Sequence, residues 1–519
     1  MTDTIDGLLR LRATVDPDKV AVVDPEQRIT YRELDSSTRA LAAVLVQAGI
    51  GKGTRVGLIM PNGVRWVQLA LAVTRIGGVL VPLSTLLAPG ELAAQLRVAA
   101  VQVLISVYEF RGHRYLDDLA AELNVELGPG TVAHPALPAL RQVQRPDEIY
   151  RHAATEAAAV LVGPMGAGVS PSDPLLIMFT SGSSGMPKGV RHSHGNALAA
   201  VRSGLRARCI DADTRLYLPM PFFWVGGFGS GVLSVLLVGA TLVTEPSPEA
   251  VTTLRLLERE RVTLFRGWPD QAEALARQRQ SIDLSSLQSG SLEALLPPDQ
   301  RPRPGSRANL FGMTESFGPY CGYPADMDMP ESAWGSCGHP FDGMEIRIVD
   351  VEDGRPLPEG VIGMIQIRGP HILRGICRRS REEVFTPDGY YPTGDLGRLD
   401  DLGFLFYHGR SDDMFKVSGA TVYPSEVQQA LRTLDGVQAA FVTNVPGPQG
   451  NRVGAAVVCP AGHGPARLRA AARAVLSSFK VPTLWLVLET DDAIPRGGTG
   501  KVDNRALRKL ISQSAESKG

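Results

Sequence analysis

The chain has 519 residues, of which 44% are apolar and 21% charged, and its formal net charge is −1. This composition is typical of a folded globular protein and excludes a disordered or a collagen-like chain. Because 53 basic residues balance 54 acidic ones, nothing favours nucleic acid as a partner, and we expect none.

The cysteines and the apolar stretches indicate the compartment. Five cysteines without a C-x-x-C pair cannot form a disulfide framework, so we expect reduced thiols. Residues 1–16 have acidic residues where a secretory signal needs a basic start. The longest apolar stretch, residues 228–243, is shorter than the ~20 residues that cross a bilayer and is interpreted as a buried helix running into a strand. We therefore expect a cytoplasmic protein without membrane insertion.

The first half of the chain alternates between helical and strand patterns. Apolar spacing predicts helices at residues 31–48, 64–76 and 90–99, and strands at residues 55–60, 78–82 and 101–106. This alternation is typical of parallel sheets covered by helices. Residues 128–173 are rich in Gly, Pro and Ala and are expected to be mostly loop or linker, and the alternation resumes over residues 175–266.

The character of the chain changes after Met344. Short strands at residues 345–350, 364–369 and 404–409, separated by Gly and Pro turns, predict a small antiparallel sheet or barrel. From Ser411 a compact mixed unit follows, in which Ser425 and Gln428 predict a capping box at a helix start. The fold class is therefore α/β: a large N-terminal part with helix-covered parallel sheets and a small β-barrel-like subdomain, followed by a small α+β domain.

The most informative segment is residues 175–198, LLIMFTSGSSGMPKGVRHSHGNAL. An apolar strand is followed by a loop rich in Ser and Gly, then by a lysine and a helix. Glycines let backbone N–H groups approach an anion, hydroxyls add donors, and the lysine adds charge. A flexible linker is the alternative, but the position directly after a strand argues against it. The predicted phosphate cradle consists of Thr180, Ser181, Gly182, Ser183, Ser184, Gly185 and Lys188. It is not a Walker loop, because Pro187 precedes Lys188 and Gly189 follows it.

The motif TSGSSGMPKGV resembles the signature of the adenylate-forming enzymes, a superfamily of acyl-CoA synthetases, adenylation domains and luciferases. Four further segments resemble this superfamily in its order: FGMTES at Phe311, YPTGDLG at Tyr391, GRSDDMFKVSGATVYPSEV at Gly409 and PRGGTGK at Pro495. The similarity extends over residues 30–511, and it is closest to acyl-CoA or aryl-CoA ligases. It implies an AMP-binding and acyl-binding domain at residues 1–410 and a mobile C-terminal domain with a catalytic lysine loop at residues 411–519.

The resemblance also implies a role for each matched residue. Thr314 would donate to the α-phosphate of ATP, Glu315 would hold Mg²⁺, and Lys501 would bridge carboxylate and phosphate oxygens. Adenine would be bound by Phe311, Gly312, Gly290 and Ser291, and ribose by Asp395 and Arg410. Asp412 would be the hinge, and Gly419 would lie beside the pantetheine arm of CoA. Taken singly, each of these residues also suits a core, turn or surface position.

The acyl pocket is expected around PMPFFWVGGFGSG, residues 219–231, where Trp224 stands in the place of a histidine that is usual in the superfamily. An apolar, aromatic-lined cavity would be formed by Trp224, Val225, Gly226, Phe228, Trp268 and Phe317. Core packing is the alternative for each of these aromatics. No acidic residue stands out to hold an amino group, which argues against amino-acid substrates.

The sequence therefore predicts an acid–thiol ligase that uses ATP, Mg²⁺ and CoA. A hydrophobic carboxylic acid, whether fatty, aryl or polycyclic, would be converted to an acyl-AMP and then to a thioester. Alternatives are acyl transfer to a carrier protein, a single half-reaction, or a non-catalytic acyl-binding or nucleotide-binding homologue. A homodimer is compatible with the sequence.

Overall fold

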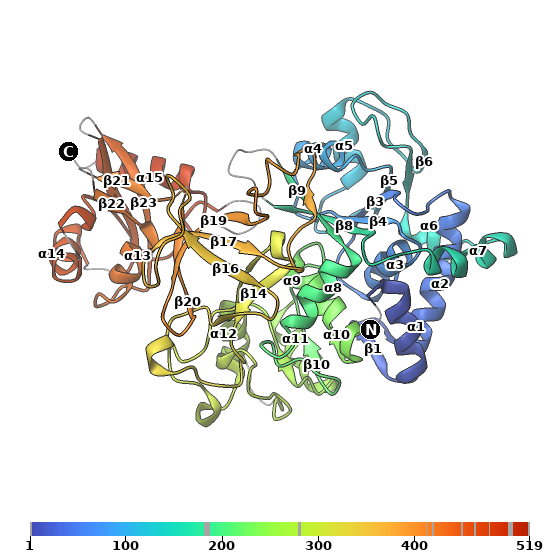
Figure 1. Ribbon diagram of the computed structural model, residues 1–519, viewed down its shortest axis with the longest axis horizontal. Coiled ribbons are helices and arrows are strands. Elements are labelled where there is room, and N and C mark those ends of the chain that lie inside the picture. Colours follow the sequence, from blue (N-terminus) through green and yellow to red (C-terminus); the bar gives the residue numbers. More distant parts are fainter. Residues whose placement is uncertain are drawn as a thin grey trace. The chain divides into compact units, whose positions relative to one another are not determined.

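The computed structural model describes residues 3–180, 187–278, 282–411, 413–417, 420–447, 450–460, 463–476, 478–496 and 502–516. The chain forms two compact units (Figure 1). The first contains Met1–Glu345 and Ile367–Tyr391, and the second contains Ile346–Gln366 and Pro392–Gly519. The predicted division into residues 1–410 and a mobile domain of residues 411–519 stays a prediction.

The first unit is built around an eight-stranded sheet. Its five central strands are parallel, and its edge strands are antiparallel to their neighbours. The order is β18 (Gly375–Ile376), β9 (Lys188–Ser193), β8 (Pro174–Thr180), β4 (Val79–Pro82), β3 (Arg55–Ile59), β5 (Val103–Ser106), β7 (Gln142–Gln144) and β6 (Gly130–Thr131). The parallel strands predicted from the apolar runs are thus confirmed.

A second sheet of the first unit has five strands. Its order is β12 (Leu264–Phe265), β10 (Arg215–Tyr217), β11 (Thr241–Val243), β1 (Val20–Val23) and β2 (Arg28–Thr30). Neighbouring strands are parallel, except that β1 and β2 are antiparallel. A small third sheet holds β13 (Phe311–Met313), β14 (Gly318–Gly322) and β15 (His339–Pro340). Short 3₁₀ turns lie at Glu293–Leu295, Pro298–Gln300, Thr314–Ser316 and Glu331–Ala333.

Helices bury their apolar faces against these sheets. The three predicted helices are confirmed as α2 (Tyr31–Gln47), α3 (Val64–Arg75) and α4 (Pro89–Ala99). Thr30 and Glu33 form a capping box that fixes the start of α2, while α3 is buried almost throughout. Further helices of the first unit include α1 (Ile5–Val15), α5 (Tyr115–Leu123), α8 (His194–Ser203), α11 (Ala250–Arg259) and α12 (Pro269–Arg277).

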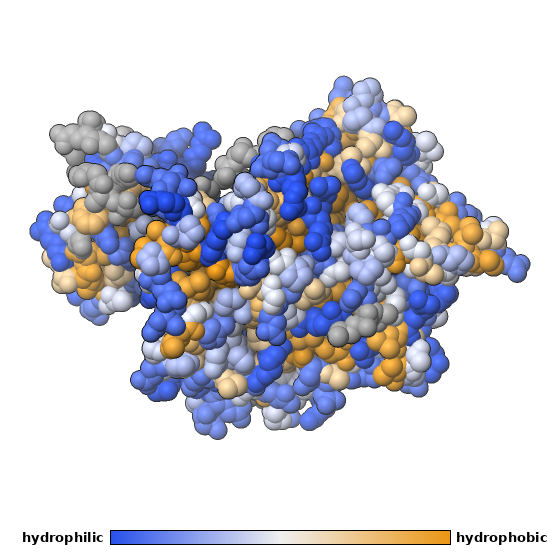
Figure 2. All heavy atoms as spheres, viewed as in Figure 1, coloured by the Kyte–Doolittle hydropathy of each residue, from blue (hydrophilic) through white to orange (hydrophobic). Residues whose placement is uncertain are grey.

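Residues 128–173 are not mostly linker, so that prediction is wrong. They contain β6, β7, α6 (Pro146–Arg151) and α7 (Glu156–Ala167), in which Thr155 caps the first turn. Apolar side chains gather on α7, where Val160 and Leu161 are 66% and 49% exposed (Figure 2). In the part of the chain that is described, no helix has both the length and the apolar character to cross a membrane.

The predicted buried helix running into a strand is confirmed at residues 225–243. The chain forms α9 (Val225–Gly227), a π-helical turn (Phe228–Leu233), α10 (Ser234–Val238) and then β11. A Cβ at Gly227 would lie 2.1 Å from the Pro221 carbonyl oxygen, so the glycine allows the helix to pack closely on its preceding loop. This packing sets the position of Trp224 and Val225.

The second unit contains three sheets. A four-stranded sheet has the order β16 (Glu345–Val349), β17 (Gly363–Arg368), β19 (Tyr391–Leu399) and β20 (Leu405–Arg410), and a hairpin joins β21 (Phe415–Val417) to β22 (Ala420–Val422). The third sheet holds β23 (Ala439–Gly447), β24 (Gly450–Val458) and β25 (Leu484–Leu488). The described helices of this unit are α13 (Pro424–Arg432), α14 (Pro465–Val475) and α15 (Asn504–Glu516), and a 3₁₀ turn lies at Ser478–Lys480. The predicted Ser425 capping box is wrong, because α13 begins at Pro424 and the Ser425 hydroxyl donates to the His408 carbonyl.

Candidate active site

The hairpin of β8 and β9 carries both ends of the predicted phosphate cradle. Thr180 is the last residue of β8 and pairs with Lys188, the first residue of β9. The intervening cradle residues Ser181, Gly182, Ser183, Ser184 and Gly185 lie outside the described residues. The structure therefore places the cradle lysine at the end of a central sheet.

Thr314 and Glu315 lie in a tight 3₁₀ turn between β13 and β14. A Cβ at Gly312 would lie 2.1 Å from the Gly318 carbonyl oxygen, so only glycine allows the two strands to approach this closely. Phe317 adopts a left-handed conformation, with φ of 53°, and reverses the chain. The turn holds the Glu315 side chain in the interior, where it is 5% exposed.

Glu315 meets Lys188 and a residue that the sequence did not single out, Tyr391. The Lys188 ammonium forms an ion pair with the Glu315 carboxylate and donates to the Tyr391 hydroxyl at 2.6 Å. The Tyr391 hydroxyl in turn donates to Glu315 Oε1 at 3.1 Å. Three motifs far apart in the sequence thus meet at one charged cluster.

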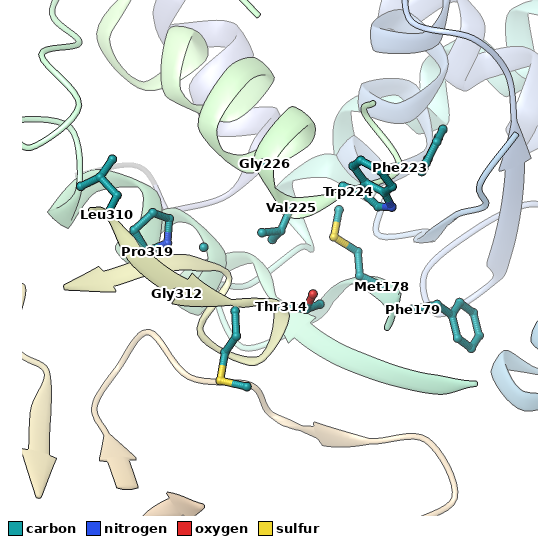
Figure 3. Close-up of a pocket in the computed structure, with 12 residues that line it drawn as sticks. Met178, Phe179, Phe223, Trp224, Val225, Gly226, Leu310, Gly312, Thr314 and Pro319 are labelled. Atoms are coloured by element: carbon teal, nitrogen blue, oxygen red, sulfur yellow. The ribbon is translucent and has the colours of Figure 1, made fainter. Parts of the chain in front are cut away.

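A cavity of about 270 Å³ adjoins this turn (Figure 3). Its walls come from β8, the loop before α9 and the β13–β14 hairpin. They are formed by Met178, Phe179, Phe223, Trp224, Val225, Gly226, Leu310, Gly312, Met313, Thr314, Gly318 and Pro319. None of these side chains is ionisable, and the Thr314 hydroxyl is the one hydrogen-bonding side chain besides the Trp224 indole.

The other residues expected to form the acyl pocket lie beside the cavity. Phe228 and Phe317 are buried in the hydrophobic core, where Phe228 packs 5.6 Å from Trp66. Trp268 is the N-cap residue of α12 and contacts Trp224 edge-on, with ring centroids 6.4 Å apart. Trp224, Val225 and Gly226 therefore line the cavity, Trp268 contacts Trp224, and the two phenylalanines belong to the core and not to the cavity wall.

The residues expected to bind adenine lie in three places. Gly312 lines the cavity, and Phe311 on β13 packs edge-on against Tyr320. The Ser291 hydroxyl accepts a hydrogen bond from the Phe265 backbone at 3.1 Å, and Gly290, with φ of 94°, packs against Cys209. Gly290 and Ser291 thus hold the end of β12 and are not among the cavity-lining residues.

In the second unit, Asp395 and Arg410 face each other across β19 and β20. Arg410 Nη1 lies 3.1 Å from Asp395 Oδ1 and donates to the Thr393 carbonyl at 2.8 Å. The pairing orients an almost buried carboxylate with a guanidinium beside it. Asp412, Gly419 and Lys501 lie outside the described residues.

The described side chains fit a magnesium ion only when a phosphate ligand shares it. No group of three or more His, Cys, Asp or Glu residues in the described part of the chain is arranged to hold a metal. Mg²⁺ is commonly held by one or two carboxylates together with substrate phosphates. Glu315, a single buried carboxylate next to a lysine, suits that arrangement.

Comparison with known proteins agrees with this geometry. The sequence model of the family described as "AMP-binding enzyme" matches residues 9–377. The chain is 33% identical to the 3-[(3aS,4S,7aS)-7a-methyl-1,5-dioxo-octahydro-1H-inden-4-yl]propanoyl:CoA ligase of Mycobacterium tuberculosis, over 95% of this chain and 96% of the relative. It is 32% identical to a feruloyl-CoA synthase of Amycolatopsis sp, over 96% and 97% of the two chains. A solved structure of a Mycobacterium tuberculosis fatty acyl CoA synthetase superposes with a TM-score of 0.72 at 25% identity and covers 99% of both chains.

Proposed function

The chain belongs to the AMP-binding enzyme family and is an acid–thiol ligase of the acyl-CoA synthetase type, and on this premise we propose that it activates a compact hydrophobic acid, aryl or polycyclic, for transfer to CoA. The observation that carries this proposal is a cavity next to the turn of Thr314 and Glu315 that has no ionisable side chain among its described lining residues. Such a cavity favours an acid whose only charge is the reacting carboxylate.

The size of the cavity narrows the substrate class. The cavity volume of about 270 Å³ lies just below the ~300–1,000 Å³ that is usual for small-molecule sites. Aromatic walls such as Trp224 and Phe223 suit ring systems, which pack on them with little loss of rotational freedom. The relatives named for a bicyclic propanoyl group and for a feruloyl group support the same class.

The reaction joins two anions, so the site must offset their repulsion. A substrate carboxylate oxygen forms a bond to the α-phosphorus, the bond to the β-phosphate oxygen breaks, and pyrophosphate leaves. We assign Lys188 and the Thr314 hydroxyl to the phosphate oxygens, where donors and a fixed cation stabilise charge that develops in the transition state. Bound Mg²⁺ would neutralise phosphate charge, and Glu315 would hold it.

The second half-reaction uses CoA. The thiol sulfur attacks the acyl carbon, AMP leaves, and the thiol proton passes to solvent. Within this proposal Asp395 accepts hydrogen bonds from the ribose hydroxyls, with Arg410 beside it. Lys501 bridges the carboxylate and the phosphate during adenylation. Asp412 is the hinge, and Gly419 lines the path of the pantetheine arm. These roles come from the motif match.

The test is a panel of aryl, polycyclic and fatty acids assayed in two arms. Acid-dependent pyrophosphate exchange measures adenylation, and mass spectrometry of the acyl-CoA measures thioester formation. We expect both activities, with kcat/KM highest for a ring-containing acid. Exchange without thioester formation would favour a carrier-protein acceptor or a single half-reaction, and no exchange with any acid would contradict the proposal.

A further inference from the structure

His192 lies on β9 and connects that strand to the turn that carries Thr314 and Glu315. Its side chain is almost fully buried, and the residue is 1% exposed. The ring nitrogen Nε2 lies 2.8 Å from the Thr314 carbonyl oxygen, and Nδ1 lies 2.8 Å from the Asn196 side-chain nitrogen. The imidazole thus joins β9 to the turn through a hydrogen bond at each ring nitrogen.

Backbone groups at the two ends of this chain of hydrogen bonds determine where every proton lies. The Ser193 backbone N–H can only donate, so Asn196 Oδ1, at 2.6 Å, is the acceptor and Asn196 Nδ2 is a donor. Asn196 Nδ2 donates to His192 Nδ1, which leaves the ring proton on Nε2. That proton points at the Thr314 carbonyl, which can only accept.

Burial keeps this imidazole neutral. It lowers the pKa of His192 to about 4, while the Glu315 carboxylate raises the pKa and the Arg374 guanidinium lowers it. The edge of the Phe317 ring packs against the imidazole with centroids 4.9 Å apart. The ring therefore has one protonation state and one orientation at neutral pH.

His192 and Lys188 act on the same turn from one face of β9. They are four residues apart on a strand, so their side chains point to the same side. Lys188 pairs with the Glu315 carboxylate, and His192 donates to the preceding carbonyl, that of Thr314. Two attachments to adjacent residues fix both the position and the rotation of the turn relative to β9.

We propose that His192 is a positioning residue that holds the Thr314–Glu315 turn in register with Lys188. The inference rests on the proposed function insofar as Thr314 and Glu315 are assigned to phosphate and Mg²⁺. His192 itself touches neither substrate in this scheme. Its contribution is the N–H bond to the Thr314 carbonyl, which a side chain with an amide N–H at similar reach can replace.

His194, the first residue of α8, provides a matched control two positions after His192. It is also fully buried, and its Nδ1 accepts from the Ile5 backbone at 3.3 Å. Its Nε2 has no hydrogen-bond partner among the described residues. A change at His194 therefore disturbs packing to a similar degree without touching the turn.

The test compares His192→Leu, His192→Gln and His194→Leu in the full-length protein, with three readouts. The first is the adenylation rate with the best acid of the panel. The second is the gain in affinity for a non-hydrolysable ATP analogue when Mg²⁺ is added, measured by calorimetry. The third is amide hydrogen exchange of residues 311–318.

We expect His192→Leu to lower the adenylation rate at least about tenfold, which is the scale of one buried hydrogen bond. In this variant the affinity for the ATP analogue without Mg²⁺ should stay near that of the wild type. The gain in affinity on adding Mg²⁺ should fall, and amide hydrogen exchange of residues 311–318 should become faster. His192→Gln should bring all three readouts to within about threefold of the wild-type values. His194→Leu should also stay within about threefold of the wild type in all three.

The proposal is overturned if His192→Leu matches the wild type in all three readouts, if His192→Gln is as impaired as His192→Leu, or if His194→Leu is equally impaired. If His192→Leu does not fold, His192→Asn, whose amide is too short to reach Thr314, replaces it in the same comparison. A wild-type protein inactive with every acid contradicts the proposed function alone, because the binding and exchange readouts still decide the role of His192.

Discussion

The Lys188 ammonium is held by the Glu315 carboxylate, although 127 residues separate them in the chain. The Lys188 and Glu315 side chains are 18% and 5% exposed, so the pair is largely shielded from water. Under the proposed function, this ion pair would keep a cation and the carboxylate assigned to Mg²⁺ within reach of the same phosphates.

Lys188→Ala should lower the adenylation rate by about 10²–10³, because a preorganised cation at the phosphate oxygens is lost. It should also destabilise the fold, since the buried Glu315 carboxylate loses its cation and keeps only the Tyr391 hydroxyl. Pyrophosphate exchange and urea unfolding measure the two effects. Lys52→Ala is the control: Lys52 pairs with Asp173 at 2.6 Å but is 52% exposed, so its loss should cost about 1 kcal/mol or less and leave activity unchanged.

Tyr391→Phe should lower the adenylation rate by about 10- to 100-fold, because it removes a hydroxyl that bonds two charged groups. The ring lies 5.2 Å from the Lys188 nitrogen and is retained, so the cation–π contact persists. The adjacent Tyr390→Phe is the control, since the Tyr390 hydroxyl bonds the exposed Glu345. Equal activity of the two variants would contradict a role for Tyr391.

Trp224→Ala should change which acids are used. It enlarges the cavity, so kcat/KM should fall at least about tenfold for the preferred compact acid and fall less, or rise, for longer acids. The measurement is the ratio of kcat/KM values across the acid panel. Trp334→Ala serves as the control, because Trp334 packs under Arg303 and is not a cavity residue; a shift in the ratio there too would argue against a specificity role for Trp224.

Folding stability should decrease as the pH falls from about 6.5 to 4. Burial lowers the pKa of both His192 and His194 from 6.5 to about 4. Between these values the unfolded chain binds protons that the folded chain does not, so protonation favours unfolding. Urea unfolding at pH 7.5 and pH 5 should show a loss of about 2 kcal/mol per histidine. His194→Leu should remove about half of this pH-dependent loss, whereas an unchanged loss would show that other groups cause it.

Local patterns in the sequence predicted the fold well where apolar periodicity was clear. Helices α2 and α3 and strands β3 and β5 lie close to where the spacing placed them. Helix α7 was missed because its Ala, Gly and Pro content resembles a loop, although Thr155 caps it and Pro164 is accommodated inside it. At α13 the proline at the first helical position sets the start, and Ser425 is used elsewhere.

The candidate site was predictable where motifs carry the chemistry. Lys188, Thr314 and Glu315 were identified from their motifs, and the structure brings them together. Tyr391 was not assigned a role, because its two contacts depend on tertiary structure. His192 could be connected with Lys188 only once the structure showed that residues 188–193 form β9, because the sequence pattern had placed a helix after the lysine. Residue type alone could not distinguish Phe228 and Phe317 in the core from Trp224 in the cavity wall.

The path of the chain between the two units has a consequence for synthesis on the ribosome. In chain order, Ile346–Gln366, which belongs to the second unit, precedes Ile367–Tyr391, which belongs to the first. A nascent chain that ends at Glu345 already holds Lys188 and Glu315 but lacks Tyr391, their shared hydroxyl partner. The charged cluster is therefore complete only once Tyr391 has been synthesised, and a fragment that ends at Glu345 or Gln366 would lack that hydroxyl.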